Sequence, residues 1–177
     1  MNDEKYTIAD HTHRFGLWTA ARAASKSLLS NKEIKGILED MQLRIQVDLL
    51  RQEEDLTVLK YQEWFKGQCD TFKEKVKQLE CKDIKKERIS HGLAAKVISI
   101  YIKTVEVIPS KGLSTLSEVA FPPIDSILLK KINKVNNLSL DVIWSKYTWE
   151  QYIETIDKIV SLDPLQLMWK IESNWDY

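Results

Sequence analysis

Apolar residues recur at helical spacing along most of the chain. Between residues 93 and 107 they fall at Val97, Ile98, Tyr101, Ile102 and Val105, which share one side of a helix. Similar patterns predict further helices over residues 7–30, 32–42, 56–80, 83–89, 123–134, 139–145, 148–161 and 164–173. Residues 43–56 are ambiguous between a short helix and a loop, and 109–123 read as a loop. The sequence therefore predicts an all-α, compact fold of roughly seven to nine helices.

Length and composition favour one globular domain over residues 1–177. The hydrophobic fraction is 44%, and glycine and proline together make nine residues, which excludes disordered and collagen-like classes. No stretch of about 18 apolar residues is present, and Met1–Lys5 lacks a signal-peptide hydrophobic region, so a cytoplasmic protein without a membrane partner is expected. Cys69 and Cys81 are too few for a metal cluster and are expected to be reduced thiols.

Charge is balanced overall but unevenly distributed. The chain has 26 basic and 26 acidic residues. Residues 60–103 hold 11 basic and 6 acidic side chains, a balance of +5. This excess precedes a glycine turn, where contacts with phosphate groups would be useful. The alternative is a solvated, lysine-rich helix face.

Two segments carry the candidate chemistry. In the first, Gly92 opens a helix that presents Lys96 near its start. The glycine permits a sharp turn and close approach, and the N–H groups at a helix N-terminus favour a phosphate oxygen. In the second, Pro122 and Pro123 preset the first turn of another helix, which contains Asp125. The lysine and the carboxylate are 29 residues apart in the chain.

An amine and a carboxylate presented in this way are the parts needed to cut a base from DNA. A neutral Lys96 amine can attack the sugar C1′ atom, expel the base and leave an imine on the enzyme. Elimination at the 3′ phosphate then follows. Asp125 would stabilise positive charge on the opening sugar and move protons.

The pattern resembles the helix–hairpin–helix (HhH-GPD) DNA glycosylases, and most closely their archaeal-type 8-oxoguanine branch. A hairpin glycine four residues before the lysine matches Gly92 and Lys96, and a second lysine seven residues on matches Lys103. A Pro-x-Asp helix start about thirty residues downstream matches Pro123-Ile124-Asp125. Residues 165–175 are similar to the closing helix of that branch. Ala94 departs from the wider superfamily, which has a second hairpin glycine there.

The resemblance implies a helix–hairpin–helix element over about residues 83–107, with no metal and no cofactor. It implies that Lys96 is the Schiff-base nucleophile and Asp125 the catalytic carboxylate. It further implies that the DNA backbone is contacted around the hairpin and its helix, by His91, Gly92, Ala94 and Lys103.

The expected function is a DNA glycosylase with AP lyase activity in DNA repair. Its partner would be duplex DNA with a damaged or modified base, with 8-oxoguanine the leading candidate, and the protein is expected to be a monomer. One alternative is a noncatalytic nucleic-acid-binding or host-defence module that retains the hairpin. Another is a helical protein-interaction domain in which the motif is coincidental.

The N-terminal helix is the second candidate region. His13, Arg14, Trp18 and Arg22 could recognise an extruded base, with Trp18 stacking on it and the others reading its edge or a phosphate. The alternative is that Phe15 and Trp18 are core residues, that Arg22 pairs with a carboxylate and that the histidines cap the helix. His11 and His13 lack a third ligand at a spacing suited to zinc.

The remaining tryptophans are expected mainly in the core. Trp144, Trp149 and Trp169 fall in apolar helical patterns. The segment from Trp144 to Tyr147 precedes a helix cap at Thr148 and could also line a cleft.

Overall fold

The computed structural model describes residues 6–24, 29–79, 89–163 and 168–174. Within these ranges the regular structure is helical throughout and contains no strand, so the all-α prediction is confirmed. None of the helices in the described ranges has both the length and the apolar character needed to cross a membrane. Residues 83–88, which make up nearly all of the first helix of the predicted helix–hairpin–helix element, lie outside the described residues.

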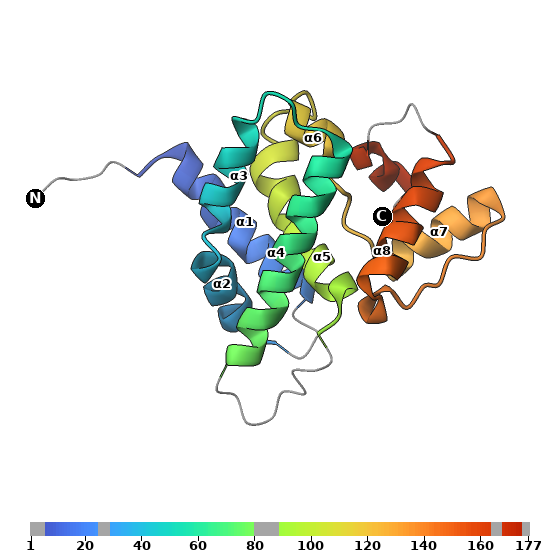
Figure 1. The fold of residues 1–177 in the computed structure, drawn as a ribbon, viewed down its shortest axis with the longest axis horizontal. Coiled ribbons are helices and arrows are strands. Elements are labelled where there is room, and N and C mark those ends of the chain that lie inside the picture. The colour runs from blue at the N-terminus through green and yellow to red at the C-terminus, as the bar shows by residue number, and fades with distance from the viewer. Residues whose placement is uncertain (1–5, 25–28, 80–88, 164–167, 175–177) are drawn as a thin grey trace, which may run out of the picture.

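The chain forms eleven elements in the described ranges (Figure 1). In order, they are α1 (Ile8–Ala24), α2 (Asn31–Asp40), α3 (Leu43–Arg51), α4 (Val58–Gln78), α5 (His91–Ile102), the π-helix η2 (Lys103–Val107), α6 (Thr115–Val119), α7 (Ser126–Asn136), the 3-10 helix η3 (Trp144–Lys146), α8 (Trp149–Val160) and the 3-10 helix η4 (Met168–Asn174).

Side-chain caps set where most helices begin. Ser30 and Glu33 form a capping box at α2, and Thr148 and Gln151 form another at α8. The hydroxyl of Ser90 accepts from Leu93 N at the start of α5. These polar side chains satisfy N–H groups that would otherwise lack a partner at the helix start.

Two predicted segments are wrong, and one open alternative is resolved. Residues 43–56, ambiguous between a short helix and a loop, contain α3, whereas the predicted loop 109–123 contains α6. The predicted helix 139–145 is absent, and only the short η3 is formed there. Ser114 explains α6, since its hydroxyl accepts from Ser117 N and donates to the buried Glu106 carboxylate. Short elements of this kind depend on tertiary contacts that periodicity does not reveal.

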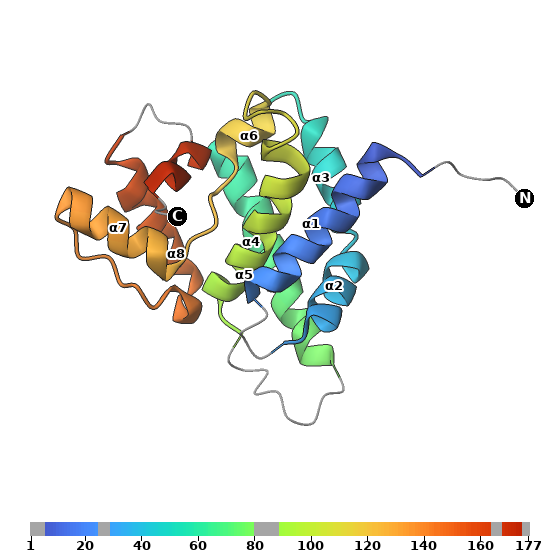
Figure 2. The ribbon, with the colours of Figure 1, turned by 180° about the vertical axis from the view of Figure 1, so that it is seen from behind.

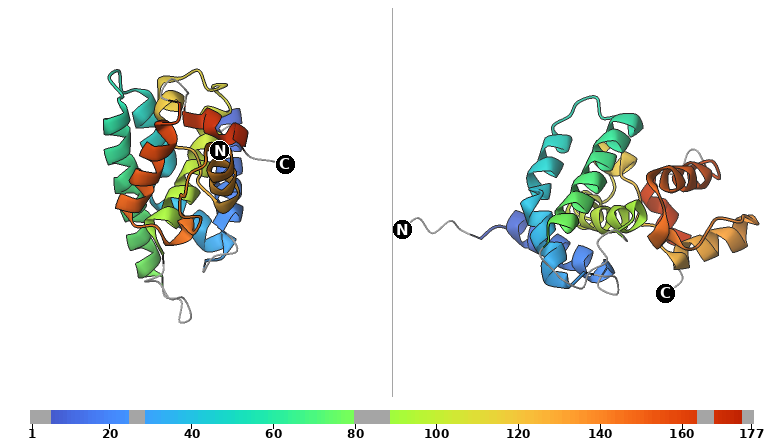
Figure 3. Two further views of the ribbon diagram at one scale, coloured as in Figure 1. Left: turned by 90° about the vertical axis from the view of Figure 1, so that its right-hand side faces the viewer. Right: turned by 60° about the horizontal axis from the view of Figure 1, so that its bottom comes forward.

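α5 is the central helix. It packs against α1 and α4 on the N-terminal side and against α8 and η3 on the C-terminal side. Figures 1 and 2 show α7, α8 and η4 grouped beside the α1–α5 bundle, and the right-hand view in Figure 3 shows the same separation. Nearly all of α5 is buried. Side chains of α5 that face the C-terminal group are therefore held between the two parts.

An aromatic cluster joins the two groups. Phe121 lies between Phe65 of α4 and Tyr152 of α8, with ring centroids 5.4 and 6.2 Å away, and Phe65 and Tyr152 are stacked 6.0 Å apart. Phe121 also packs edge-on against Tyr61 at 5.1 Å. Because Phe121 immediately precedes the Pro122-Pro123 pair, this packing fixes the chain that leads to Asp125.

Candidate functional site

Lys96 and Asp125 meet between α5 and the start of α7. Lys96 Nζ donates to Asp125 Oδ2 at 3.1 Å, and the two side chains are only 12% and 15% exposed. The sequence predicts that the two groups approach within about 6 Å, the range over which opposite charges interact strongly, across a concave and partly basic cleft. The distance is confirmed, and the cleft stays a prediction. A lysine and an aspartate far apart in sequence thus share one sheltered position.

Asp125 is fixed by the backbone of α7. Its Oδ1 accepts from Ile127 N and Leu128 N, both at 3.0 Å, while Oδ2 receives Lys96. The residue is therefore the N-cap of α7, not a member of its first turn as the sequence suggested. The positive end of the helix stabilises its charge. Asp125 Oδ1 thus caps α7, and Oδ2 remains directed at the Lys96 amine.

Trp144 completes the surroundings of the amine. Lys96 Nζ lies 4.6 Å from the centroid of the Trp144 ring, a cation–π contact. The sequence placed Trp144 in the core or along a cleft, and the residue is partly buried. Its position over Lys96 could not be read from the pattern, because 48 residues separate the two in the chain. The amine thus lies between a carboxylate and an indole face.

A second ion pair lies on the same side of α5. Lys103, seven residues after Lys96, donates to the Glu172 carboxylate of η4. Burial raises the pKa of Glu172, Lys103 opposes that shift, and the negative charge of Asp125 adds to it. Glu172 was not identified from sequence, where only the resemblance of residues 165–175 pointed to this region. Lys103 is engaged within the protein, whereas the resemblance implies a DNA contact for it.

Gly92 is required by the loop that carries Trp144. A Cβ atom on Gly92 would lie 1.9 Å from the Trp144 carbonyl oxygen. Gly92 N donates to Tyr147 O at 3.2 Å, and the Ser90 hydroxyl donates to Ser145 O at 2.7 Å. The glycine therefore permits close approach, as predicted, but the group that approaches is the protein's own backbone.

The other residues predicted to contact the DNA backbone have internal partners as well. The N–H groups of Leu93 and Ala94 donate to the hydroxyl and carbonyl oxygens of Ser90, and Ala94 is fully buried. His91 bonds to the Asp70 carboxylate at 2.8 Å and lies 3.1 Å from Lys73 Nζ. In the structure these groups hold the start of α5, and a phosphate contact there stays a prediction.

The α1 residues predicted to recognise a base divide into two groups. His13 Nδ1 is 2.7 Å from the Tyr101 hydroxyl, and Tyr101 is about 140° around α5 from Lys96. The structure therefore does not bring His13 and Lys96 together. Trp18 stacks on Phe15 with ring centroids 5.6 Å apart and lies under the Arg22 guanidinium at 4.8 Å. Arg14 lies over the Tyr6 ring.

The alternative core assignment for two of these residues is wrong. Phe15 is 49% exposed and Trp18 is 43% exposed. Their places in the core are taken by Leu17, Ala20 and Ala21. α1 therefore packs into the core through Leu17, Ala20 and Ala21, and its aromatic residues Phe15 and Trp18 lie at the surface.

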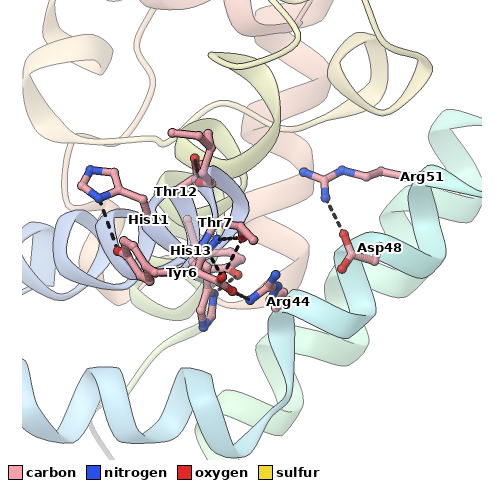
Figure 4. A network of polar contacts seen from close by, with 11 residues as sticks. Tyr6, Thr7, His11, Thr12, His13, Arg44, Asp48 and Arg51 are labelled. Atoms are coloured by element: carbon pink, nitrogen blue, oxygen red, sulfur yellow. Dashed lines mark hydrogen bonds and ion pairs between the residues drawn. The ribbon is translucent and has the colours of Figure 1, made fainter. Parts of the chain in front are cut away.

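His13 belongs to a polar network on the side of α5 away from Lys96 (Figure 4). The network borders a cavity of about 280 Å³ between α1, α3 and α5. Arg44 donates to Asp10 at 2.7 Å, and hydrogen bonds from Thr7 and then Arg44 lower the pKa of Asp10. Burial, and then the positive charge of Arg44, lower the pKa of His13.

His13 should make stability depend on pH. Its pKa in the folded protein is below the usual value of 6.5, so below about pH 6.5 the unfolded chain binds the proton more readily. Stability should therefore fall as pH drops through this range, and His13→Gln should reduce that fall. Melting temperatures measured from about pH 7 to pH 5 test this.

The cysteines do not form a site in the described residues. Cys69 is a fully buried free thiol, and burial raises its pKa strongly. Cys81 lies outside the described residues.

The chain matches no protein-family model, and comparisons with curated proteins and with solved structures find no match either. The resemblance to helix–hairpin–helix glycosylases therefore depends on the motif residues alone.

Proposed function

We propose that this protein is a DNA glycosylase with AP lyase activity that works through Lys96 and Asp125. The observation that carries the proposal is the 3.1 Å contact between the Lys96 amine and the Asp125 carboxylate in a sheltered position. The same amine lies against the Trp144 ring. An amine and a carboxylate are the groups that base excision through an imine requires. An aromatic face beside them can stack on an extruded base.

Asp125 would act first as a proton acceptor. Asp125 Oδ2 lies 3.1 Å from Lys96 Nζ, where it can take a proton from the ammonium group and so leave the amine nucleophilic when the substrate is bound. The amine nitrogen then bonds to C1′ of the sugar while the bond from C1′ to the base breaks. The base leaves with that electron pair and takes up a proton. The nitrogen then loses one of its two protons, and the bond between C1′ and O4′ breaks as O4′ takes up a proton, which gives the protonated imine.

The lyase step follows from the imine. Removal of a proton from C2′ breaks the bond between C3′ and its oxygen, so the 3′ phosphate leaves and the strand is cut. Hydrolysis of the imine then returns Lys96. Asp125 suits the proton transfers because its other oxygen is anchored by two backbone N–H groups, which fix its orientation.

The substrate would be a damaged or modified base in duplex DNA. An extruded base needs an aromatic or apolar surface and polar groups at its edge. Trp144 supplies such a surface next to the amine, and the resemblance to the archaeal-type branch makes 8-oxoguanine the first base to test. Recognition of the extruded base by Arg14, Trp18 and Arg22 is a further part of this proposal. The described contacts of α1 do not place these three residues next to the Lys96 amine.

The experiment is a strand-cleavage assay on duplexes that each carry one modified base, 8-oxoguanine among them. Wild-type protein should release one base and cut the strand. Asp125→Asn, which keeps the shape and the capping oxygen, should lower base release by about a hundredfold or more. Binding of the duplex without base release from any substrate would instead support the noncatalytic alternative.

A further inference from the structure

One face of α1 combines positive charge with stacked aromatic rings. His11, Arg14, Phe15, Trp18 and Arg22 follow i, i+3, i+4, i+7, i+11 spacing, so they share one side of the helix, and all five are exposed. We call this set the α1 stripe; it runs for roughly 17 Å along the helix. Figure 2 shows α1 on the outer side of the bundle, in front of α4. The catalytic pair does not use this surface.

The stripe contains a column of flat groups. The Phe15 and Trp18 rings are stacked with 19° between their planes, and the Arg22 guanidinium lies 4.8 Å from the Trp18 centroid. The column therefore combines two stacked aromatic rings with a guanidinium group held against one of them. Nucleic-acid bases stack on both kinds of surface. Such a column is already ordered before a ligand arrives, which lowers the entropy cost of binding.

The charge of the stripe is of one sign. Arg14 and Arg22 are its charged members, and it includes no acidic residue. The nearest carboxylate on α1, Asp10, is turned to Arg44 of α3 and held there by a hydrogen bond. A single strand carries phosphates next to exposed bases, so it can bind cationic groups and stacking surfaces that lie side by side. A surface that binds another protein more often has charges of both signs at its rim.

We infer that the α1 stripe binds unpaired DNA by stacking two or more bases on the Phe15–Trp18–Arg22 column. Duplex DNA offers its phosphates to the same arginines but keeps its base faces covered. The stripe should therefore prefer single strands. This binding does not require the Lys96 amine, so the inference and the proposed function can fail separately.

The test is fluorescence anisotropy with a labelled oligothymidine of about 12 nucleotides and with a duplex of the same length. Wild-type protein should bind the single strand, and Phe15→Ala combined with Trp18→Ala should weaken that binding by about tenfold or more. Duplex binding should change by less than about twofold. Trp18→Leu, which keeps apolar volume without a ring, should lose single-strand affinity too. Leu59→Ala, at a 71% exposed position on α4, is the matched control and should bind as wild type.

Two further variants separate stacking from charge. Arg22→Lys keeps the charge, so it should lower affinity while leaving the salt dependence unchanged; Arg22→Gln should lower both. Lys96→Ala should bind oligothymidine as wild type does. The inference is overturned if wild-type protein does not bind the single strand, or if the folded double variant binds it equally well. It is also overturned if the stripe mutations alter only self-association, measured by sedimentation.

Discussion

Lys96→Ala should abolish base release and strand cleavage, with a loss of at least about a thousandfold. The amine is the only group of the proposed site that can form the imine, and it lies 3.1 Å from the carboxylate that would take its proton. The fold should survive, because alanine is favourable in a helix and Asp125 keeps both of its backbone hydrogen bonds. Single-turnover cleavage of the best substrate measures the loss, and circular dichroism checks the fold.

Lys103→Ala is the matched control for this change. It removes a lysine from the same side of α5 but leaves the Lys96–Asp125 contact in place. Cleavage should persist, with DNA binding weakened at most modestly. If Lys103→Ala stops cleavage while Lys96→Ala retains it, Lys103 and not Lys96 is the nucleophile.

Gly92→Ala should destabilise the protein by roughly 3 kcal/mol or more. The added methyl carbon would lie 1.9 Å from the backbone oxygen of Trp144, so α5 and the η3 segment would have to separate. For a domain of this size the melting temperature should fall by about 6 °C or more. Activity should fall as well, since the same movement carries the Trp144 ring away from Lys96.

Two other glycines provide the control for Gly92. Gly36 and Gly67 lie within α2 and α4, and a Cβ atom on either would meet no atom within 4 Å. Alanine at these positions should stabilise the protein by about 0.5–1 kcal/mol, because glycine loses more backbone freedom on folding. Thermal denaturation of the three variants compares them directly. Equal stability of Gly92→Ala and wild type would show that η3 does not hold its place against α5.

The sequence predicts α5 and the helix start at Asp125 from local features, whereas the expectation that Lys96 and Asp125 meet comes from the family resemblance. The stripe from Val97 to Val105 is apolar enough to require burial, so α5 follows from periodicity. Pro122, Pro123 and Asp125 define a helix start through their own chemistry, although the cap geometry moves Asp125 just outside the helix. Where local chemistry decides the structure, the prediction succeeds.

The surroundings of the pair depend on long-range packing and could not be predicted. Trp144 and Glu172 come to the Lys96 side of α5 because the C-terminal group folds back on that helix. On α1, the alternative prediction placed the large aromatic residues Phe15 and Trp18 on the buried face of the helix. The helix instead packs closely through Gly16, whose absent side chain admits Val105 and Tyr101. Phe15 and Trp18 are thereby left at the surface.

Borohydride trapping followed by peptide mapping identifies the residue that attacks the sugar. Reduction during turnover of a modified duplex should convert the imine into a stable amine link between protein and DNA. This link should be on Lys96 and absent from Lys96→Ala. A link on any other residue, or equal trapping of Lys96→Ala and wild type, would contradict this prediction.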